Sequence, residues 1–256
     1  MLVVGDETQN RGFPWATLLL VFANVAVFAA QMFVGDSITY GYSLVPQEIT
    51  TGEDIVGLVA VPIREPVSDA NGTRYVNTTA MITLQPGPRP IYLTIVTSMF
   101  LHANWLHLVG NMVFLLVFGR NIERAMKPTL FLIFYLQCGI AAGMTHVYVA
   151  PESAAPYLGA SGAISGIMGA YFFIFPFNWV KVWMIFAIVD VPSVILIGGW
   201  ALLQYVGTLA AVRMGAVQTG VAYWAHLGGF VAGVAVVLTL LGTFAVLTLA
   251  TRKPAE

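Results

Sequence analysis

The sequence has little charge. Of its 256 residues only 9% are charged and 58% are hydrophobic, and the mean hydropathy is +0.82. A soluble globular protein carries about 25% charged residues. This chain therefore cannot cover a surface of its size with charge, and we expect it to lie in lipid. The net charge of −1 leaves no basic excess for binding nucleic acid.

Cysteine and membrane-embedded carboxylates are also scarce. The single cysteine, Cys138, lies in an apolar run and excludes an internal disulfide framework. No Asp or Glu falls within the apolar part of any candidate span, which argues against a proton or cation relay built on carboxylates. No group of His, Cys and carboxylate residues has the spacing of metal ligands, so we expect no cofactor.

Long apolar runs are what the sequence does contain. A hydrocarbon core of about 30 Å takes about 20 apolar residues per helix. The sequence predicts an all-α membrane protein with six transmembrane helices, at residues 14–34, 104–118, 129–150, 161–175, 191–212 and 222–250. The second and fourth of these are unusually short, although the second could begin near Ile95.

The distribution of Lys and Arg predicts the orientation, because cytoplasmic loops are enriched in both. If the N-terminus is cytoplasmic, the inside residues are Arg11, Arg120, Arg124, Lys127, Lys181, Arg252 and Lys253, and the outside residues are Arg64, Arg74, Arg89 and Arg213. We therefore expect both termini in the cytoplasm, in the cell membrane of a prokaryote. The membrane domain would span 14–250, with an extramembrane insertion at 36–92 and short tails at 1–13 and 251–256.

The insertion is the one sizeable polar segment. It contains two β-prone runs on either side of Asn71-Gly72. An Asn-Gly pair between such runs is typical of a tight β-hairpin turn. We therefore expect an extramembrane β-hairpin in the first loop.

Histidines are found near or within the spans, where an ionisable group is by default a functional hypothesis. His107 and Asn111 are four residues apart and share one face of the second helix. We expect His146, near the outer end of the third span, to face the interface. His226, in the last span, taken alone would more often be a packing residue than a catalyst.

Small residues recur every four positions in two spans. Residues 157–171, YLGASGAISGIMGAY, contain two adjacent ridges of this kind, one of Gly162, Gly166 and Ala170 and the other of Ser161, Ser165 and Gly169. The last span carries a third ridge, of Ala225, Gly229 and Gly233. Such ridges let membrane helices approach closely. If the fourth and sixth helices meet along them, Ser161 and His226 come within hydrogen-bond reach, as a serine nucleophile and its base require.

Three motifs in this order resemble the rhomboid intramembrane serine proteases. They are TSMFLHANWLHLVGNMVFLLVFGRNIE at 97–123, GASG at 159–162 and AHLGG at 225–229. Trp200 and Gln204 in GGWALLQ also look like the fifth helix of that family. The resemblance covers about residues 97–233. It implies a rhomboid-like six-helix bundle, whose short fourth helix begins below the outer surface, at the base of a water-filled cavity.

The resemblance also implies the roles of individual residues. Ser161 matches the nucleophile and His226 the general base, a dyad without a third carboxylate. His107 and Asn111 match the side chains that stabilise the oxyanion, together with the backbone N–H of Ser161.

Two further residues match the family away from the reaction. His102 matches a structural histidine of the loop, and Glu123 matches a carboxylate at the cytoplasmic end of the second helix. Both are expected to be structural rather than catalytic.

One position departs from the family pattern. The residue four after the nucleophile is often aromatic and can pack on the catalytic histidine, but here it is Ser165. Either Ser165 holds His226 by a hydrogen bond, or Tyr223 or Trp224 supplies the missing ring. Of these roles, we expect Ser165 to serve packing, because it lies one turn deeper than Ser161 on the same face.

The sequence thus predicts an intramembrane serine endopeptidase in the lipid bilayer. Its partners would be single-span transmembrane proteins, cut near the outer face of the bilayer with a small residue on the acyl side, and nucleic acid is not expected. Two alternatives stay open. One is a catalytically inactive rhomboid-like protein that binds membrane clients. The other is a small-solute channel or transporter, which would place polar residues along a continuous path.

Overall fold

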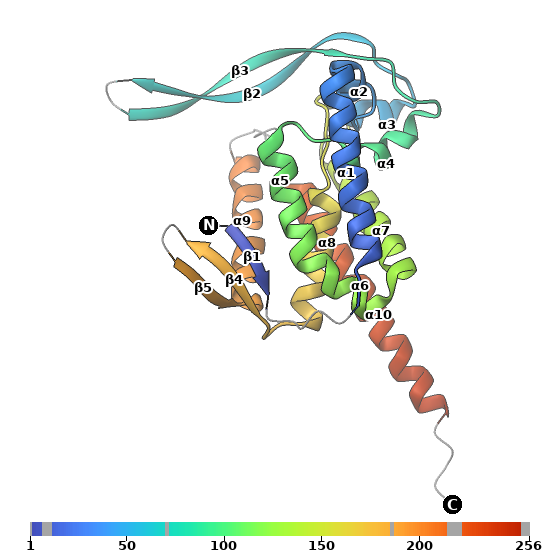
Figure 1. Ribbon diagram of the computed structural model, residues 1–256. Helices are drawn as coiled ribbons and strands as arrows, with labels where there is room; N and C mark the ends of the chain where they lie inside the picture. Colours follow the sequence, from blue (N-terminus) through green and yellow to red (C-terminus); the bar gives the residue numbers. More distant parts are fainter. Residues whose placement is uncertain (1, 7–11, 70–71, 185–186, 214–221, 252–256) are drawn as a thin grey trace, which may run out of the picture.

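A computed structural model describes residues 2–6, 12–69, 72–184, 187–213 and 222–251. Within these ranges five helices are long and apolar enough to cross a bilayer. They are α1 (Trp15–Val34), the helix Trp105–Met126, α7 (Pro128–Val149), Ser193–Ala210 of α9 (Ser193–Arg213) and Tyr223–Leu241 of α10 (Tyr223–Thr251). With α8 (Ser161–Ile174) these helices form a bundle (Figure 1), and the protein is an integral membrane protein.

Helix α8 has 14 residues and lies in the interior of the bundle (Figure 1). Every residue from 162 to 171 is buried, and α7 and α10 pack against it. A helix of this length rises about 21 Å, which is less than the hydrocarbon thickness. Because α8 is surrounded mainly by protein, its ends need not reach both bilayer surfaces. The short helix that the sequence places at 161–175 is thus found at Ser161–Ile174.

The second span is longer than expected. It runs through α5 (Trp105–Phe114), a π-helical turn (Leu115–Gly119) and α6 (Arg120–Met126). The sequence predicts an end at residue 118, because charged residues follow it. The helix instead continues to Met126, and the charged residue Glu123 within it caps α1. Buried Glu123 accepts hydrogen bonds from the backbone N–H groups of Ala16 (2.9 Å) and Thr17 (2.8 Å) and from the Thr17 hydroxyl (2.7 Å), which caps α1.

Helices α8 and α10 touch backbone to backbone, as the small-residue ridges predict. A Cβ atom built on Gly229 would lie 2.0 Å from the carbonyl oxygen of Gly162. One built on Gly233 would lie 2.0 Å from the carbonyl oxygen of Gly166. No side chain fits at either place, so the two glycines permit the close approach.

The first loop contains β2 (Gly57–Asp69) and β3 (Gly72–Leu84), which pair antiparallel from Gly57↔Leu84 to Asp69↔Gly72. This two-stranded ribbon projects from one end of the bundle (Figure 1). Asn71, half of the expected turn, lies outside the described residues. The rest of the loop forms α2 (Asp36–Gly41), α3 (Pro46–Thr51), α4 (Thr94–Thr97) and 3₁₀ turns at Ile91–Leu93 and Ser98–Phe100.

A second sheet was not expected. It has the order β1-β4-β5 and joins β1 (Leu2–Asp6) to β4 (Trp179–Met184) and β5 (Ala187–Pro192). The expectation of an all-α membrane domain is therefore wrong for residues 2–6, 179–184 and 187–192. The carboxylate of Asp6 accepts hydrogen bonds from the hydroxyl of Tyr171 on α8 (2.8 Å) and from the side-chain amide of Asn121 on α6. This strand is therefore attached to the core of the bundle.

Candidate active site

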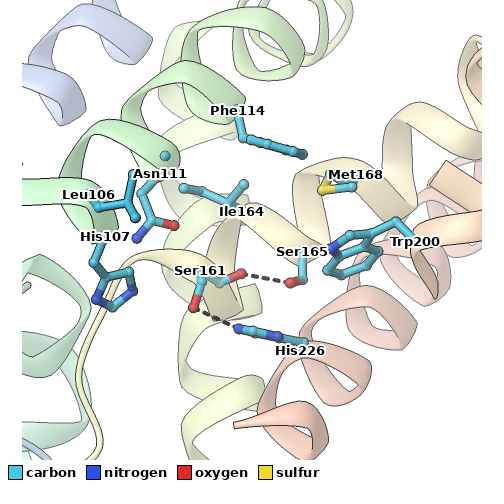
Figure 2. Close-up of a pocket in the computed structure, with 11 residues that line it drawn as sticks. Leu106, His107, Asn111, Phe114, Ser161, Ile164, Ser165, Met168, Trp200 and His226 are labelled. Carbon is cyan, nitrogen blue, oxygen red and sulfur yellow. Dashed lines mark hydrogen bonds between the residues drawn. The ribbon is translucent and has the colours of Figure 1, made fainter. Parts of the chain in front are cut away.

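A cavity of about 220 Å³ lies among α5, α8, α9 and α10 (Figure 2). It is lined by Leu106, His107, Gly110, Asn111, Phe114, Ser161, Ile164, Ser165, Met168, Trp200 and His226. All four residues to which the sequence assigns chemistry are in this set, although they come from three different helices. The structure therefore brings Ser161, His226, His107 and Asn111 to one place.

Ser161 is the first residue of α8. The chain reaches it through Gly159, whose φ of +125° is a conformation that favours glycine. A Cβ atom on Gly159 would also lie 2.7 Å from Cε1 of His107, so a side chain there would collide with that ring. The first N–H groups of a helix have no partner within it and form its positive end. Ser161 thus lies where donors and a favourable dipole converge.

His226, on α10, contacts the serine directly. Its Nε2 lies 2.8 Å from Oγ of Ser161 (Figure 2), and its Nδ1 lies 2.8 Å from Oε1 of Gln204 on α9. An amide oxygen only accepts hydrogen bonds, so the Nδ1–H donates to Gln204. The lone pair of Nε2 is then free to accept the hydrogen bond from the Ser161 hydroxyl.

His107 and Asn111 lie on the α5 side of the cavity (Figure 2). The side chain of Asn104 caps α5 by accepting a hydrogen bond from the backbone N–H of His107 at 2.9 Å. Nδ1 of His107 accepts from the Ala103 N–H at 3.4 Å, which leaves Nε2 as the protonated nitrogen. The Nδ2 group of buried Asn111 has no hydrogen-bond partner among the described residues. Both side chains therefore hold N–H groups available to a bound molecule.

The aromatic partner of His226 is Trp200, and not Tyr223 or Trp224 as expected from the sequence. The ring of Trp200 on α9 packs on the imidazole with centroids 6.1 Å apart and an angle of 40° between the planes. The expectation that Tyr223 or Trp224 supplies this ring is wrong. The Ser165 hydroxyl does not hold the imidazole by a hydrogen bond among the described residues, because it donates to the carbonyl oxygen of Ser161 at 2.6 Å, along its own helix.

Trp200 and Gln204 were noticed in the sequence only as part of a motif. They are four residues apart on α9, the same spacing that marked His107 and Asn111 as one face. A polar amide one turn from a large aromatic, in an otherwise apolar span, is the signal that could have identified them.

Two other histidines are buried near the site. His102 is 1% exposed, and the side-chain amide of Gln31 on α1 bonds both its backbone N–H (3.0 Å) and its carbonyl oxygen (3.2 Å). Its ring packs edge-on against that of His107 at 5.1 Å. His146 does not face the interface as expected. Tyr157, in the loop before α8, covers it with ring centroids 4.9 Å apart.

The family model and the similar proteins found by comparison all point to the same family. The Rhomboid domain model matches residues 90–243. The chain is 37% identical over 78 residues to Rhomboid-like protein 11, chloroplastic, of Arabidopsis thaliana, and 29% identical over 147 residues to Rhomboid protein 1, mitochondrial, of Saccharomyces cerevisiae. It is 34% identical over 84 residues to a Bacillus subtilis protein provisionally named rhomboid protease YdcA.

The match to the Arabidopsis protein covers 30% of this chain and 28% of that relative. The corresponding shares are 56% and 40% for the yeast protein, and 33% and 42% for the Bacillus protein. The chain thus matches less than half the length of each. The Rhomboid domain, in contrast, covers more than half of the chain and contains α5, α7, α8 and α9 entire. On this evidence the chain belongs to the rhomboid family.

Proposed function

We propose that this protein is an intramembrane serine endopeptidase, with Ser161 as nucleophile and His226 as general base. The observation that carries the proposal is the 2.8 Å contact between Nε2 of His226 and Oγ of Ser161. Membership of the rhomboid family supports a protease of this type at the level of the family. A hydroxyl hydrogen-bonded to an imidazole that a third group orients is the signature of an activated nucleophile.

The reaction follows from these positions. Oγ of Ser161 attacks the carbonyl carbon of the scissile peptide bond while its proton passes to Nε2 of His226. The new bond gives a tetrahedral oxyanion, and its collapse breaks the C–N bond as the leaving amine takes that proton. Water then attacks the acyl ester, giving a proton to His226, which returns it to Ser161.

The developing oxyanion would be stabilised by His107, Asn111 and the N–H of Ser161. The support is the unpartnered Nδ2 of Asn111 and the protonated Nε2 of His107, both in the same cavity as Ser161. Losing one such donor typically lowers kcat by about 10²–10³-fold. We expect that loss for Asn111→Leu, which keeps the side chain's size.

The substrates would be single-span transmembrane proteins that enter from the bilayer. Ser161 is the first residue of α8. Helix α8 begins inside the bundle, in the half nearer the β2–β3 ribbon (Figure 1). With both termini cytoplasmic, that half faces outward and the cut falls near the outer face. Two of the relatives above are organellar by name and one is bacterial, so they do not select a membrane. The cell membrane of a prokaryote stays a prediction.

The test is cleavage of a reporter transmembrane substrate in proteoliposomes, combined with labelling by a fluorophosphonate probe. Ser161→Ala should abolish both cleavage and labelling, and His226→Ala should abolish cleavage. Ser165→Ala is the matched control, since among the described residues its hydroxyl bonds one group, the backbone carbonyl of Ser161 in its own helix. Full activity of either dyad variant would refute the mechanism. A wild-type protein that binds the substrate without cutting it would instead favour the client-binding alternative.

A further inference from the structure

The imidazole of His226 is held from α9. Gln204 accepts the hydrogen bond from its Nδ1–H at 2.8 Å. The ring of Trp200, one turn earlier, packs against the imidazole at an angle of 40° (Figure 2). Phe230 packs in turn on Trp200, with centroids 6.1 Å apart. The base therefore lies on α10, but the groups that orient it belong to a different helix.

The chemistry depends on which nitrogen of His226 carries the proton. A neutral imidazole has one N–H and one lone pair, and the partner of one nitrogen determines the role of the other. With Gln204 accepting at Nδ1, the lone pair of Nε2 faces Ser161. If the proton were on Nε2, the imidazole could not accept the proton of the Ser161 hydroxyl.

An amide suits this position better than a carboxylate. Carboxylates fill the equivalent place in soluble serine proteases, but an ionised group inside a membrane span costs several kcal/mol. Gln204 lies in the middle of an apolar span and supplies an acceptor without a charge. Its amide can also accept from Nδ1–H after the imidazole has taken up a proton at Nε2.

We propose that Gln204 is the third member of a Ser–His–Gln triad, a positioning residue that fixes the tautomer and orientation of His226. The proposal rests on the proposed proteolytic function and adds a residue that acts through the base without touching the substrate. Removal of Gln204 should therefore slow the chemical step without weakening substrate binding.

The kinetic test uses Gln204→Leu and Gln204→Met, which lack the acceptor, and Gln204→Glu, which keeps an oxygen in the same place. We expect kcat to fall at least about tenfold in the first two, with KM changed less than about twofold, as for an interaction realised in the transition state. Gln204→Glu should recover most of the loss. Thr208→Val is the matched control on α9, since in the described part of the chain its hydroxyl bonds the backbone carbonyl of Gln204 and no other group.

The second readout is the ¹⁵N NMR signal of His226 in protein labelled at histidine, assigned by its loss in His226→Ala. In the wild type Nδ1 should show the shift of a protonated nitrogen and Nε2 that of an unprotonated one, and Gln204→Leu should give a mixture of tautomers. This measurement needs no substrate, so it decides the Gln204–His226 contact even if the protein proves not to be a protease. Protonated Nε2 in the neutral wild-type ring would overturn the proposal, as would wild-type kcat in folded Gln204→Leu.

Discussion

Gly233→Ala is expected to damage catalysis from a place that touches no reacting atom. Gly233 lies two turns after His226 on α10, where α10 meets α8. A Cβ atom there would lie 2.0 Å from the carbonyl oxygen of Gly166 and 2.7 Å from its Cα. These obstacles are backbone atoms of a helix, so they cannot rotate away as a side chain would.

The size of the effect follows from the geometry. Real Cβ atoms essentially never come closer than 3.0 Å to another heavy atom, so the two helices must separate by at least about 1 Å. If α10 moves as a rigid body, the 2.8 Å contact between His226 and Ser161 lengthens to about 3.8 Å, beyond hydrogen-bond distance. A misplacement of about 1 Å typically lowers the rate about 10²-fold. Overpacking should cost a further 1–3 kcal/mol or so of stability.

The assay is kcat for a reporter substrate in proteoliposomes, with thermal unfolding measured in detergent on the same preparation. Gly199→Ala on α9 is the control, because a Cβ there has no atom within 4 Å. It should keep both activity and stability. A folded Gly233→Ala protein with wild-type kcat would show that the close approach of α8 and α10 does not position the dyad.

Two further predictions concern buried carboxylates. Glu123→Ala leaves the N–H groups of Ala16 and Thr17 without their acceptor. The free energy of unfolding should therefore fall by about 1–3 kcal/mol, which lowers the melting temperature. An unchanged melting temperature would exclude this cap as a stabilising contact. Burial, with the nearby charge of Asp54, raises the pKa of Glu48 on α3 to about 7. Between about pH 4.5 and 7 the folded protein keeps a proton on Glu48 that the unfolded protein releases. The contribution of Glu48 to the free energy of unfolding is therefore full at low pH and is lost as the pH rises through 7. Glu48→Gln, which stays neutral, should melt with less pH dependence than the wild type between pH 5 and 8, and equal slopes would refute the shift.

The sequence predicted best what depends on local periodicity. Except at the end of the second span, apolar length located the spans within a few residues, and a four-residue repeat identified the close contact of Gly162 and Gly166 with α10. What it missed depends on contacts between distant segments. The pairing of β1 with β4 joins residues about 175 positions apart, and no local pattern in either segment specifies that register. The end of the second helix was missed because hydropathy records the cost of charge in lipid and not the use of Glu123 as a cap.

At the candidate active site, too, what the sequence missed is a contact between distant segments. The sequence identified the four side chains that the structure brings to one cavity, through the spacing of His107 and Asn111, the small-residue ridges and the resemblance to the rhomboid family. It did not predict what holds His226, because Gln204 acts only once α9 and α10 lie together. The small residues of α8 and α10 and the side chains of α9 thus address two separate requirements. The glycines set the distance between Ser161 and His226, and Gln204 sets the direction of the lone pair that joins them. Gly233→Ala should therefore change the distance and Gln204→Leu the tautomer, and ¹⁵N NMR of His226 distinguishes the two failures.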